Sequence, residues 1–456
     1  MFELSATELL ARYRDGSVSP VEVTEAVLAR IDTLEPRLHA LYAYDPQQAR
    51  AAAKASEQRW RAGQAGPLDG IPLTLKENIA TRGTPVPLGT AATDLVPAPA
   101  DAPAAARVRE AGAVLLAKTT MPDYGMLTSG LSSFHTASRN PWDPAHTPGG
   151  SSAGAAAAAA AGYGPLHVGT DIGGSIRLPA GWCGLVGFKP SFGRVPVDPP
   201  YIGRVAGPLT RTVADTALLM GVLSAPDGRD HMSLPPAEIV WSELSGDLTG
   251  LRVGLQLDAG AGLPVEPDIV AAVTGAARLF EQAGAIVEPL EPFLTREMLD
   301  GLDTFWRVRA WCDLAALPEE RRAKVLPYIA DWARGGATVS GVAAYRGFSQ
   351  IDAMSVAAVR ATAPFDFVLS PACPVSAPPA EWASPSNDPR RPFEHIPFTV
   401  PYNMSGQPAV SLNCGYTAMG QPIGLQIAGR RFDDLGVLRA AAAFEGIRGP
   451  QRSPDV

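Results

Sequence analysis

The segment from Gly149 to Pro190 constrains the chain more than any other stretch. It reads GGSSAGAAAAAAAGYGPLHVGTDIGGSIRLPAGWCGLVGFKP and carries glycine-flanked serines at both ends of a small-residue run that predicts a helix and a strand. Two hydroxyls can therefore lie beside exposed backbone amides. This combination is typical of a site for acyl transfer, because an attacking hydroxyl needs N–H donors for the oxyanion that it creates.

Ser175 is the candidate nucleophile. It follows two glycines in the sequence TDIGGS, directly after an apolar run. Glycine tolerates backbone angles that turn successive N–H groups in one direction. The loss of one oxyanion donor typically costs about 100- to 1000-fold in rate. The alternative is a glycine turn whose serine caps the next helix, and the motif alone leaves both interpretations open.

A nucleophilic serine also needs a base. The six histidines stand in no G-x-S-x-G or other hydrolase spacing, so a Ser-His-Asp triad is not supported. Lys76 follows the apolar run Ile71 to Leu75, where burial would lower the pKa of its amine enough to let it accept a proton. Most lysines are solvated and charged, so this spacing alone favours an ordinary lysine.

Three motifs resemble those of the amidase signature family. They are GPLDGIPLTLKENI around Lys76, PGGSSAG around Ser151 and GTDIGGSIRLPAGWCGLVGFKP around Ser175, separated by 75 and 24 residues (151 − 76 and 175 − 151) as in the family. PYNMSGQP at 401–408 and GQPIGLQI at 420–427 resemble its closing segments, so the likeness covers most of the chain. Glu77 replaces the usual aspartate and Ala153 a frequent glycine, and neither change removes a catalytic group.

The resemblance implies a role for each motif. Ser175 would be the nucleophile, Ser151 a bridging serine that follows a cis peptide bond, and Lys76 the base. A hydroxyl both donates and accepts hydrogen bonds, so Ser151 can relay the proton that Ser175 loses. The family would form the oxyanion hole from the amides of Ile172, Gly173, Gly174 and Ser175.

The residues around these motifs give further candidates. Tyr124 and Ser152 are candidates for substrate contact, with packing by Tyr124 and a helix N-cap by Ser152 as open alternatives. We expect Asp123 to make a structural hydrogen bond to neighbouring loops, and Asp171 and Arg177 to hold the nucleophile loop as an ion pair. A phosphate-binding loop is excluded as an interpretation of GGSSAG because no G-K-[ST] follows.

The order of elements predicts an α/β fold with a single large mixed β-sheet covered on both faces by helices, as the resemblance also implies. The capping boxes of Ser5 with Glu8 and Ser19 with Glu22 predict helices over 6–15 and 20–34. A helix is also expected over 153–161. The runs 409–412 and 423–427 predict an antiparallel hairpin.

No linker, repeat or charge block divides the chain, so we expect a single amidase domain over residues 1–456. Its catalytic core would occupy about 65–220 and 365–445. The segment of about 294–360 reads as mostly helical and is rich in aromatic residues, which are more often core than binding surface. In the family this region shapes the substrate pocket.

Composition excludes several classes of function. Hydrophobic residues make up 46% of the chain, charged residues 18%, and the net charge is −8. This is enough to bury a core and argues against nucleic-acid binding, which needs clustered Lys and Arg. With no basic, apolar leader and no apolar run of membrane length, we expect a cytoplasmic protein that binds no membrane. The four widely spaced cysteines predict reduced core thiols and neither metal nor cofactor.

The resemblance implies an amidase that hydrolyses the C–N bond of a small carboxylic amide to an acid and ammonia or an amine, through an acyl-Ser175 intermediate. An apolar pocket would favour an apolar or aryl amide over a charged one. The alternative is the glutamine-hydrolysing subunit of a tRNA-dependent amidotransferase, which shares the three motifs. The expected partner is a small-molecule amide, and a homodimer stays open.

Overall fold

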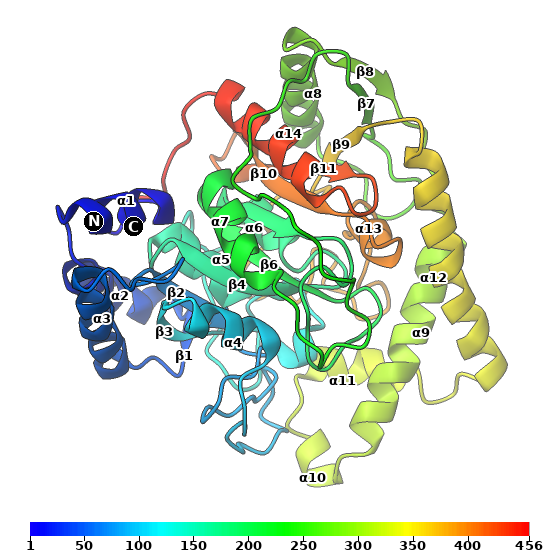
Figure 1. The fold of residues 1–456 in the computed structure, drawn as a ribbon. Coiled ribbons are helices and arrows are strands. Elements are labelled where there is room, and N and C mark those ends of the chain that lie inside the picture. The colour runs from blue at the N-terminus through cyan, green and yellow to red at the C-terminus, as the bar shows by residue number, and fades with distance from the viewer. Residues whose placement is uncertain (456) are drawn as a thin grey trace.

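The computed structural model describes residues 1–455. Their strands form one 11-stranded mixed sheet, with helices on both faces (Figure 1). The strands β3, β2 and β4 toward one end and β9, β7 and β8 at the other pair in parallel. The edge strand β1 pairs antiparallel with β3, and the strands in the middle of the sheet also pair antiparallel. In spatial order they are β1 (Leu41–Tyr42), β3 (Val114–Thr119), β2 (Pro72–Lys76), β4 (Leu166–Asp171), β6 (Val205–Thr210), β5 (Val186–Lys189), β10 (Ala409–Tyr416), β11 (Pro422–Gly429), β9 (Phe367–Pro371), β7 (Arg252–Leu255) and β8 (Ile286–Pro289).

The helices fall into those that pack on the sheet and those that extend from it. The α-helices are α1 (Ala6–Asp15), α2 (Pro20–Leu38), α3 (Pro46–Arg61), α4 (Pro103–Glu110), α5 (Ala153–Ala161), α6 (Arg177–Cys183), α7 (Val213–Leu223), α8 (Pro267–Gln282), α9 (Arg296–Ala315), α10 (Glu319–Arg322), α11 (Pro327–Arg334), α12 (Gly341–Thr362), α13 (Val400–Met404) and α14 (Asp434–Ile447). A short 3-10 turn, η1, spans Asp123–Gly125.

The capping boxes and the hairpin pattern in the sequence form the elements that they predict. Both capping boxes form, and α1 has the predicted bounds. Helix α2 continues beyond the predicted end and runs through Pro36 to Leu38, because Leu34 and Leu38 are buried in the core and their burial outweighs the hydrogen bond that proline cannot make. The predicted hairpin is confirmed as the antiparallel pair β10 and β11.

Helices α9 and α12 pack against each other at one side of the molecule (Figure 1). The two backbones approach closely, since a Cβ on Gly347 would lie 2.7 Å from the carbonyl oxygen of Gly301. Trp306 and Trp332 are buried in a second hydrophobic cluster beneath these helices, as the aromatic pattern predicted, whereas Tyr345 is 71% exposed.

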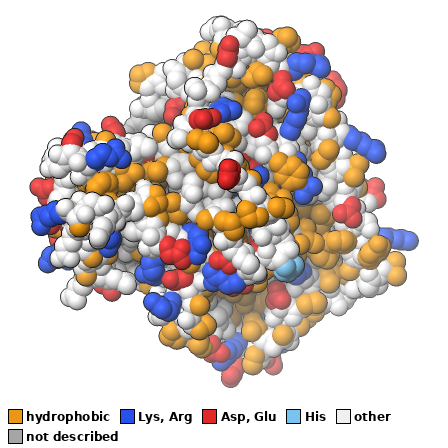
Figure 2. All heavy atoms as spheres, in the orientation of Figure 1, with side chains coloured by type: hydrophobic (Ala, Val, Ile, Leu, Met, Phe, Trp, Pro, Cys, Tyr) orange, Lys and Arg blue, Asp and Glu red, His pale blue; other side chains and the backbone are white. Residues whose placement is uncertain are grey.

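The surface carries charges of both signs. Figure 2 shows basic and acidic side chains interspersed with apolar ones on one face of the molecule.

Cys312 is exposed, so the expectation of core thiols was wrong at this position, where the side chain lies on the solvent side of α9. Among residues 1–455, no helix is both long enough and apolar enough to cross a bilayer.

Helix α5 begins against the end of strand β3. The backbone N–H of Gly154 donates to the Thr120 carbonyl at 3.1 Å. A Cβ at Gly154 would lie 2.5 Å from both the backbone nitrogen and the Oγ1 of Thr120. Only glycine allows this approach, which brings the residues just before α5 next to the end of β2.

We predict that Gly154→Ala lowers the free energy of unfolding by about 1–3 kcal/mol, because the added methyl group meets backbone atoms that cannot move aside. Gly275→Ala, on α8, is the matched control. A Cβ at Gly275 has no neighbour within 4 Å, so this change should raise stability by about 0.5–1 kcal/mol through the better helix propensity of alanine. Urea denaturation measures both, and equal effects would contradict the packing argument.

Candidate active site

Lys76 is the last residue of β2, a strand whose five residues are all buried. Its Nζ lies 2.8 Å from Ser151 Oγ, 3.0 Å from Ser152 Oγ and 3.5 Å from the Thr170 carbonyl oxygen. Burial lowers the pKa of Lys76 to about 7, and the positive charge of Arg204 acts in the same direction against the opposing charge of Asp171. A substantial fraction of this amine is therefore uncharged near neutral pH.

Ser151 and Ser152 lie between β2 and α5. The peptide bond between Gly150 and Ser151 is cis, as the resemblance implied. Ser152 is fully buried. Its Oγ accepts hydrogen bonds from Lys76 and from the Thr170 N–H at 3.3 Å, and donates to the Thr170 carbonyl at 3.2 Å.

The Ser152 hydroxyl uses its hydrogen-bonding capacity inside the protein. Contact between Ser152 and substrate stays a prediction. Ser152 occupies the N-cap position of α5, but its side chain makes no capping hydrogen bond. Its hydroxyl instead fixes the position of the Lys76 amine.

Ser175 lies between β4 and α6 and is half-buried. Its carbonyl oxygen accepts from the Ser152 N–H at 3.2 Å, which ties the two serine segments together. Ser175 lines a small pocket of about 40 Å³. The other walls are mainly apolar and include Met126, Leu127, Ile172, Leu178, Trp306 and Phe393.

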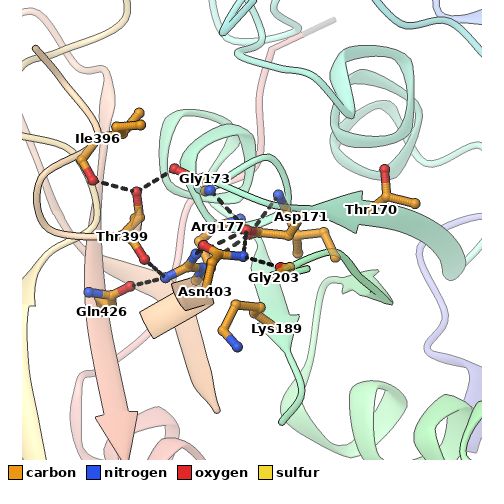
Figure 3. A network of polar contacts seen from close by, with 12 residues as sticks. Thr170, Asp171, Gly173, Arg177, Lys189, Gly203, Ile396, Thr399, Asn403 and Gln426 are labelled. Carbon is orange, nitrogen blue, oxygen red and sulfur yellow. Dashed lines mark hydrogen bonds and ion pairs between the residues drawn. The ribbon is translucent and has the colours of Figure 1, made fainter. Parts of the chain in front are cut away.

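The loop around Ser175 is built on a fully buried ion pair, as predicted (Figure 3). Arg177 Nη2 lies 3.0 Å from Asp171 Oδ1, and Arg177 Nε lies 3.1 Å from Asp171 Oδ2. The Asp171 carboxylate also accepts from the N–H groups of Gly174 at 2.8 Å and Ile176 at 3.1 Å. Burial acts to raise the pKa of Asp171, but the charge and hydrogen bonds of Arg177 hold it well below its usual range.

The same arginine ties the loop to the C-terminal part of the chain (Figure 3). Arg177 Nη1 donates to the Thr399 carbonyl at 2.9 Å and to Gln426 Oε1 at 2.7 Å. Its Nη2 donates to Asn403 Oδ1 at 2.6 Å. The Thr399 hydroxyl in turn donates to the carbonyl of Gly173 at 2.7 Å. The segments 401–408 and 420–427 thus both contact the loop that carries Ser175, through Asn403 and Gln426.

The hydrogen bonds to Asp171 change which backbone amides are free to form the expected oxyanion hole. Gly174 was expected to offer its N–H to an oxyanion, but that N–H is engaged by Asp171. The carboxylate is a strong acceptor held in the turn by Arg177, so it captures this donor. The amides of Ile172, Gly173 and Ser175 are the candidates that remain.

A larger cavity of about 590 Å³ lies next to the small pocket, and Arg309 lines both. Figure 2 shows the surface hollowed between α4 and α9. Tyr124 is half-buried on the wall of this cavity, which Asn78 and Thr170 also line. Contact between Tyr124 and substrate stays a prediction.

Asp123 has the structural role that the sequence predicted. Its Oδ1 accepts from the N–H of Ser133 at 2.7 Å, and its Oδ2 accepts from the Ser133 hydroxyl at 2.7 Å and the N–H of Leu326 at 3.0 Å. It therefore ties the wall of the cavity to the segment between α10 and α11.

Comparison with known proteins identifies the family. A model of the amidase family matches residues 22–438. The crystal structure of a bacterial aryl acylamidase of the amidase signature family superposes with a TM-score of 0.90 at 31% identity, over 98% of this chain and 96% of that one. The chain belongs to the amidase signature family. It is a hydrolase that acts on amides.

Two relatives indicate the range of activities within the family. An acylamidase from Rhodococcus erythropolis is 34% identical over 463 residues, covering 98% of this chain and 95% of that protein. A glutamyl-tRNA(Gln) amidotransferase subunit from Alkalilimnicola ehrlichii is 33% identical over 481 residues, covering 98% of each chain. Identity at this level does not separate the two activities.

Sequence reasoning missed several residues of this site. Thr399, Asn403 and Gln426 complete the network around Arg177, and Arg204 lines the cavity. The resemblance of 401–408 and 420–427 to the closing segments of the amidase signature family was the available signal for Asn403 and Gln426. It marked the segments without indicating which side chains turn inward.

We predict that Ser152→Ala lowers kcat for amide hydrolysis about 10-fold, the effect of losing one hydrogen bond to the Lys76 amine, with little change in KM. Steady-state kinetics separates the two constants. Ser138→Ala is the matched control, because its buried hydroxyl bonds to Thr120 and to the His39 carbonyl, away from Lys76. A raised KM with unchanged kcat would instead support contact between Ser152 and substrate.

Proposed function

We propose that this enzyme hydrolyses the C–N bond of a small amide carrying an apolar or aryl group, through an acyl-Ser175 intermediate. The observation that carries the proposal is the buried Lys76 amine, held 2.8 Å from Ser151 Oγ beside the apolar pocket that Ser175 lines. A buried amine with a lowered pKa, next to a hydroxyl that can pass on a proton, supplies the base that a serine nucleophile needs.

The reaction begins with attack of Ser175 Oγ on the amide carbon. As the C–O bond forms, the Ser175 proton passes to Ser151, whose own proton passes to neutral Lys76. The same chain then returns a proton to the nitrogen as the C–N bond breaks, so the amine leaves as a neutral molecule. Water attacks the acyl-Ser175 ester in a second cycle and releases the acid.

Negative charge develops on the amide oxygen during both attacks. We assign its stabilisation to the backbone amides of Ile172, Gly173 and Ser175. The hydrogen bond from Thr399 to the carbonyl of Gly173 and the bonds from the loop to Asp171 support this assignment, because donors that are already fixed need no rearrangement in the transition state.

The character of the small pocket supports an apolar or aryl group next to the scissile bond. Trp306 and Phe393 meet edge to face, with ring centroids 5.0 Å apart, and both line this pocket. Aromatic walls of this kind bind flat apolar groups through burial of their surface.

A second candidate function is glutamine hydrolysis within a tRNA-dependent amidotransferase. It is favoured by the similarity over nearly the whole chain to the amidotransferase protein from Alkalilimnicola ehrlichii described above. In that case the activity would depend on a partner protein.

We predict that kcat/KM for amide hydrolysis rises with pH through about 7 and levels off above it. Protonated Lys76 cannot accept a proton, and burial lowers its pKa to about 7. Lys76→Met should remove this rise and lower the rate by about 100- to 10,000-fold.

Lys118→Met is a matched control for this profile. Burial also lowers the pKa of Lys118 to about 7, but its amine contacts Thr81 and the carbonyl of Ile79 rather than the serines. The rise in rate should keep its midpoint in this variant. If kcat/KM stopped rising with pH in Lys118→Met but still rose in Lys76→Met, Lys76 would not be the base.

We predict that purified protein releases amine or ammonia from anilides and arylacetic amides, and that Ser175→Ala lowers this rate by at least about 1000-fold. Mass spectrometry of the wild type mixed with a slowly turned-over aryl ester should detect an acyl group on Ser175, absent from the variant. Turnover of glutamine alone, or turnover only after a partner is added, would instead support the amidotransferase function.

A further inference from the structure

Arg204 and Arg309 line the larger cavity without an acidic partner. Both are half-buried, and neither forms an ion pair with an aspartate or glutamate among residues 1–455. Within residues 1–455, the Arg204 side chain donates a single, long hydrogen bond of 3.4 Å, to the Pro199 carbonyl. Arg309 contacts the sulfur of Met126 at 3.4 Å, and its buried Nε has no hydrogen-bond partner within the described residues.

Both guanidinium groups lie against the ring of Tyr201. The Cζ of Arg309 lies 4.7 Å from the ring centroid and the Cζ of Arg204 lies 5.4 Å from it. Burial lowers the pKa of Arg204, and the positive charge of Arg309 lowers it further. Two neighbouring cations without a counterion are unfavourable in the free protein.

Three other interior arginines of this protein pair with a carboxylate. Arg177 pairs with Asp171, Arg194 with Asp434, and Arg307 with Asp303. The cavity is also lined by Asp198 and Asp313, but both are exposed and neither forms an ion pair with the two arginines. Arg204 and Arg309 therefore lack the carboxylate partner that the fold supplies to these three arginines.

The two arginines face the catalytic centre. Arg309 lines both the larger cavity and the small pocket beside Ser175. Thr170 lines the same cavity, and its carbonyl is 3.5 Å from the Lys76 amine. A molecule that reaches from Arg309 into the small pocket therefore passes Ser175.

We propose that Arg204 and Arg309 bind a carboxylate of the substrate, so that the amide carries an apolar group for the small pocket and an anionic group for the larger cavity. A guanidinium group forms two parallel hydrogen bonds to a carboxylate, and the bound anion supplies the missing counterion. This inference rests on the proposed amidase function and names the class of amide that the site accepts.

The test compares matched anilides that differ in one charge. On the amine side, 4-carboxyacetanilide is compared with 4-methylacetanilide; on the acyl side, succinanilic acid is compared with butyranilide. The wild type should favour the carboxylate in at least one pair by about 10-fold or more in kcat/KM, the effect of a hydrogen bond to a charged group. Ratios of one or less in both pairs would overturn the inference.

Variants then assign the preference to the two arginines. Arg204→Gln and Arg309→Gln should each reduce the ratio by about 10-fold, mainly through a higher KM for the carboxylate. Arg346→Gln is the matched control, since Arg346 is exposed on α12 and lines neither cavity, and it should keep the ratio of the wild type. A preference that survives in both cavity variants would overturn the inference.

A binding measurement separates this inference from the proposed function. Calorimetry with the Ser175→Ala protein gives the affinity for both members of each pair without turnover. Tighter binding of the carboxylate, lost when Arg309→Gln is added, supports the inference even if no anilide is hydrolysed. Hydrolysis of the neutral anilides without any preference in binding or rate overturns the inference and leaves the amidase function intact.

Discussion

The fully buried ion pair of Asp171 and Arg177 is the interaction on which the rest of the site depends. Removing two charges from water is costly and is offset only when the geometry is good and the remaining hydrogen bonds are made. Here the carboxylate accepts from the loop that carries Ser175, and the guanidinium donates to Thr399, Asn403 and Gln426. The C-terminal segments therefore help to hold the loop that carries Ser175, although they lie more than 200 residues away in the sequence.

This pair also bears on the state of Lys76. A bare carboxylate near a buried amine would favour the charged ammonium form. The charge of Asp171 does act to raise the pKa of Lys76, but burial dominates and brings it to about 7. Because Arg177 neutralises Asp171, the field at Lys76 is weak enough for desolvation to decide. The ion pair thus fixes the shape of the loop and helps to leave the neighbouring amine uncharged.

Features that depend on neighbours in the sequence could be predicted, and features that depend on contacts between distant segments could not. The capping boxes, the hairpin and the ion pair of Asp171 with Arg177 all join residues close in sequence. Strands β5 and β6 were not predicted, because VGFK and VAGPLT are short and contain glycine or proline. Substrate contact was predicted for Ser152 because the sequence does not reveal that the Ser152 hydroxyl lies against Lys76 and Thr170. Arg204 and Arg309 are 105 positions apart in the sequence (309 − 204), and the sequence does not indicate that both lie against one tyrosine ring.

Helix α9, which packs closely on α12, carries residues that line the pocket, whereas the candidate catalytic residues lie at the central sheet. Trp306 and Arg309, which shape the pocket and the cavity, belong to α9, whereas Lys76, Ser151 and Ser175 lie on or beside the strands of the central sheet. Substitutions in α9 can thus alter the walls of the pocket while Lys76, Ser151 and Ser175 keep their positions. In the laboratory, this division makes α9 the natural segment to randomise for new specificities.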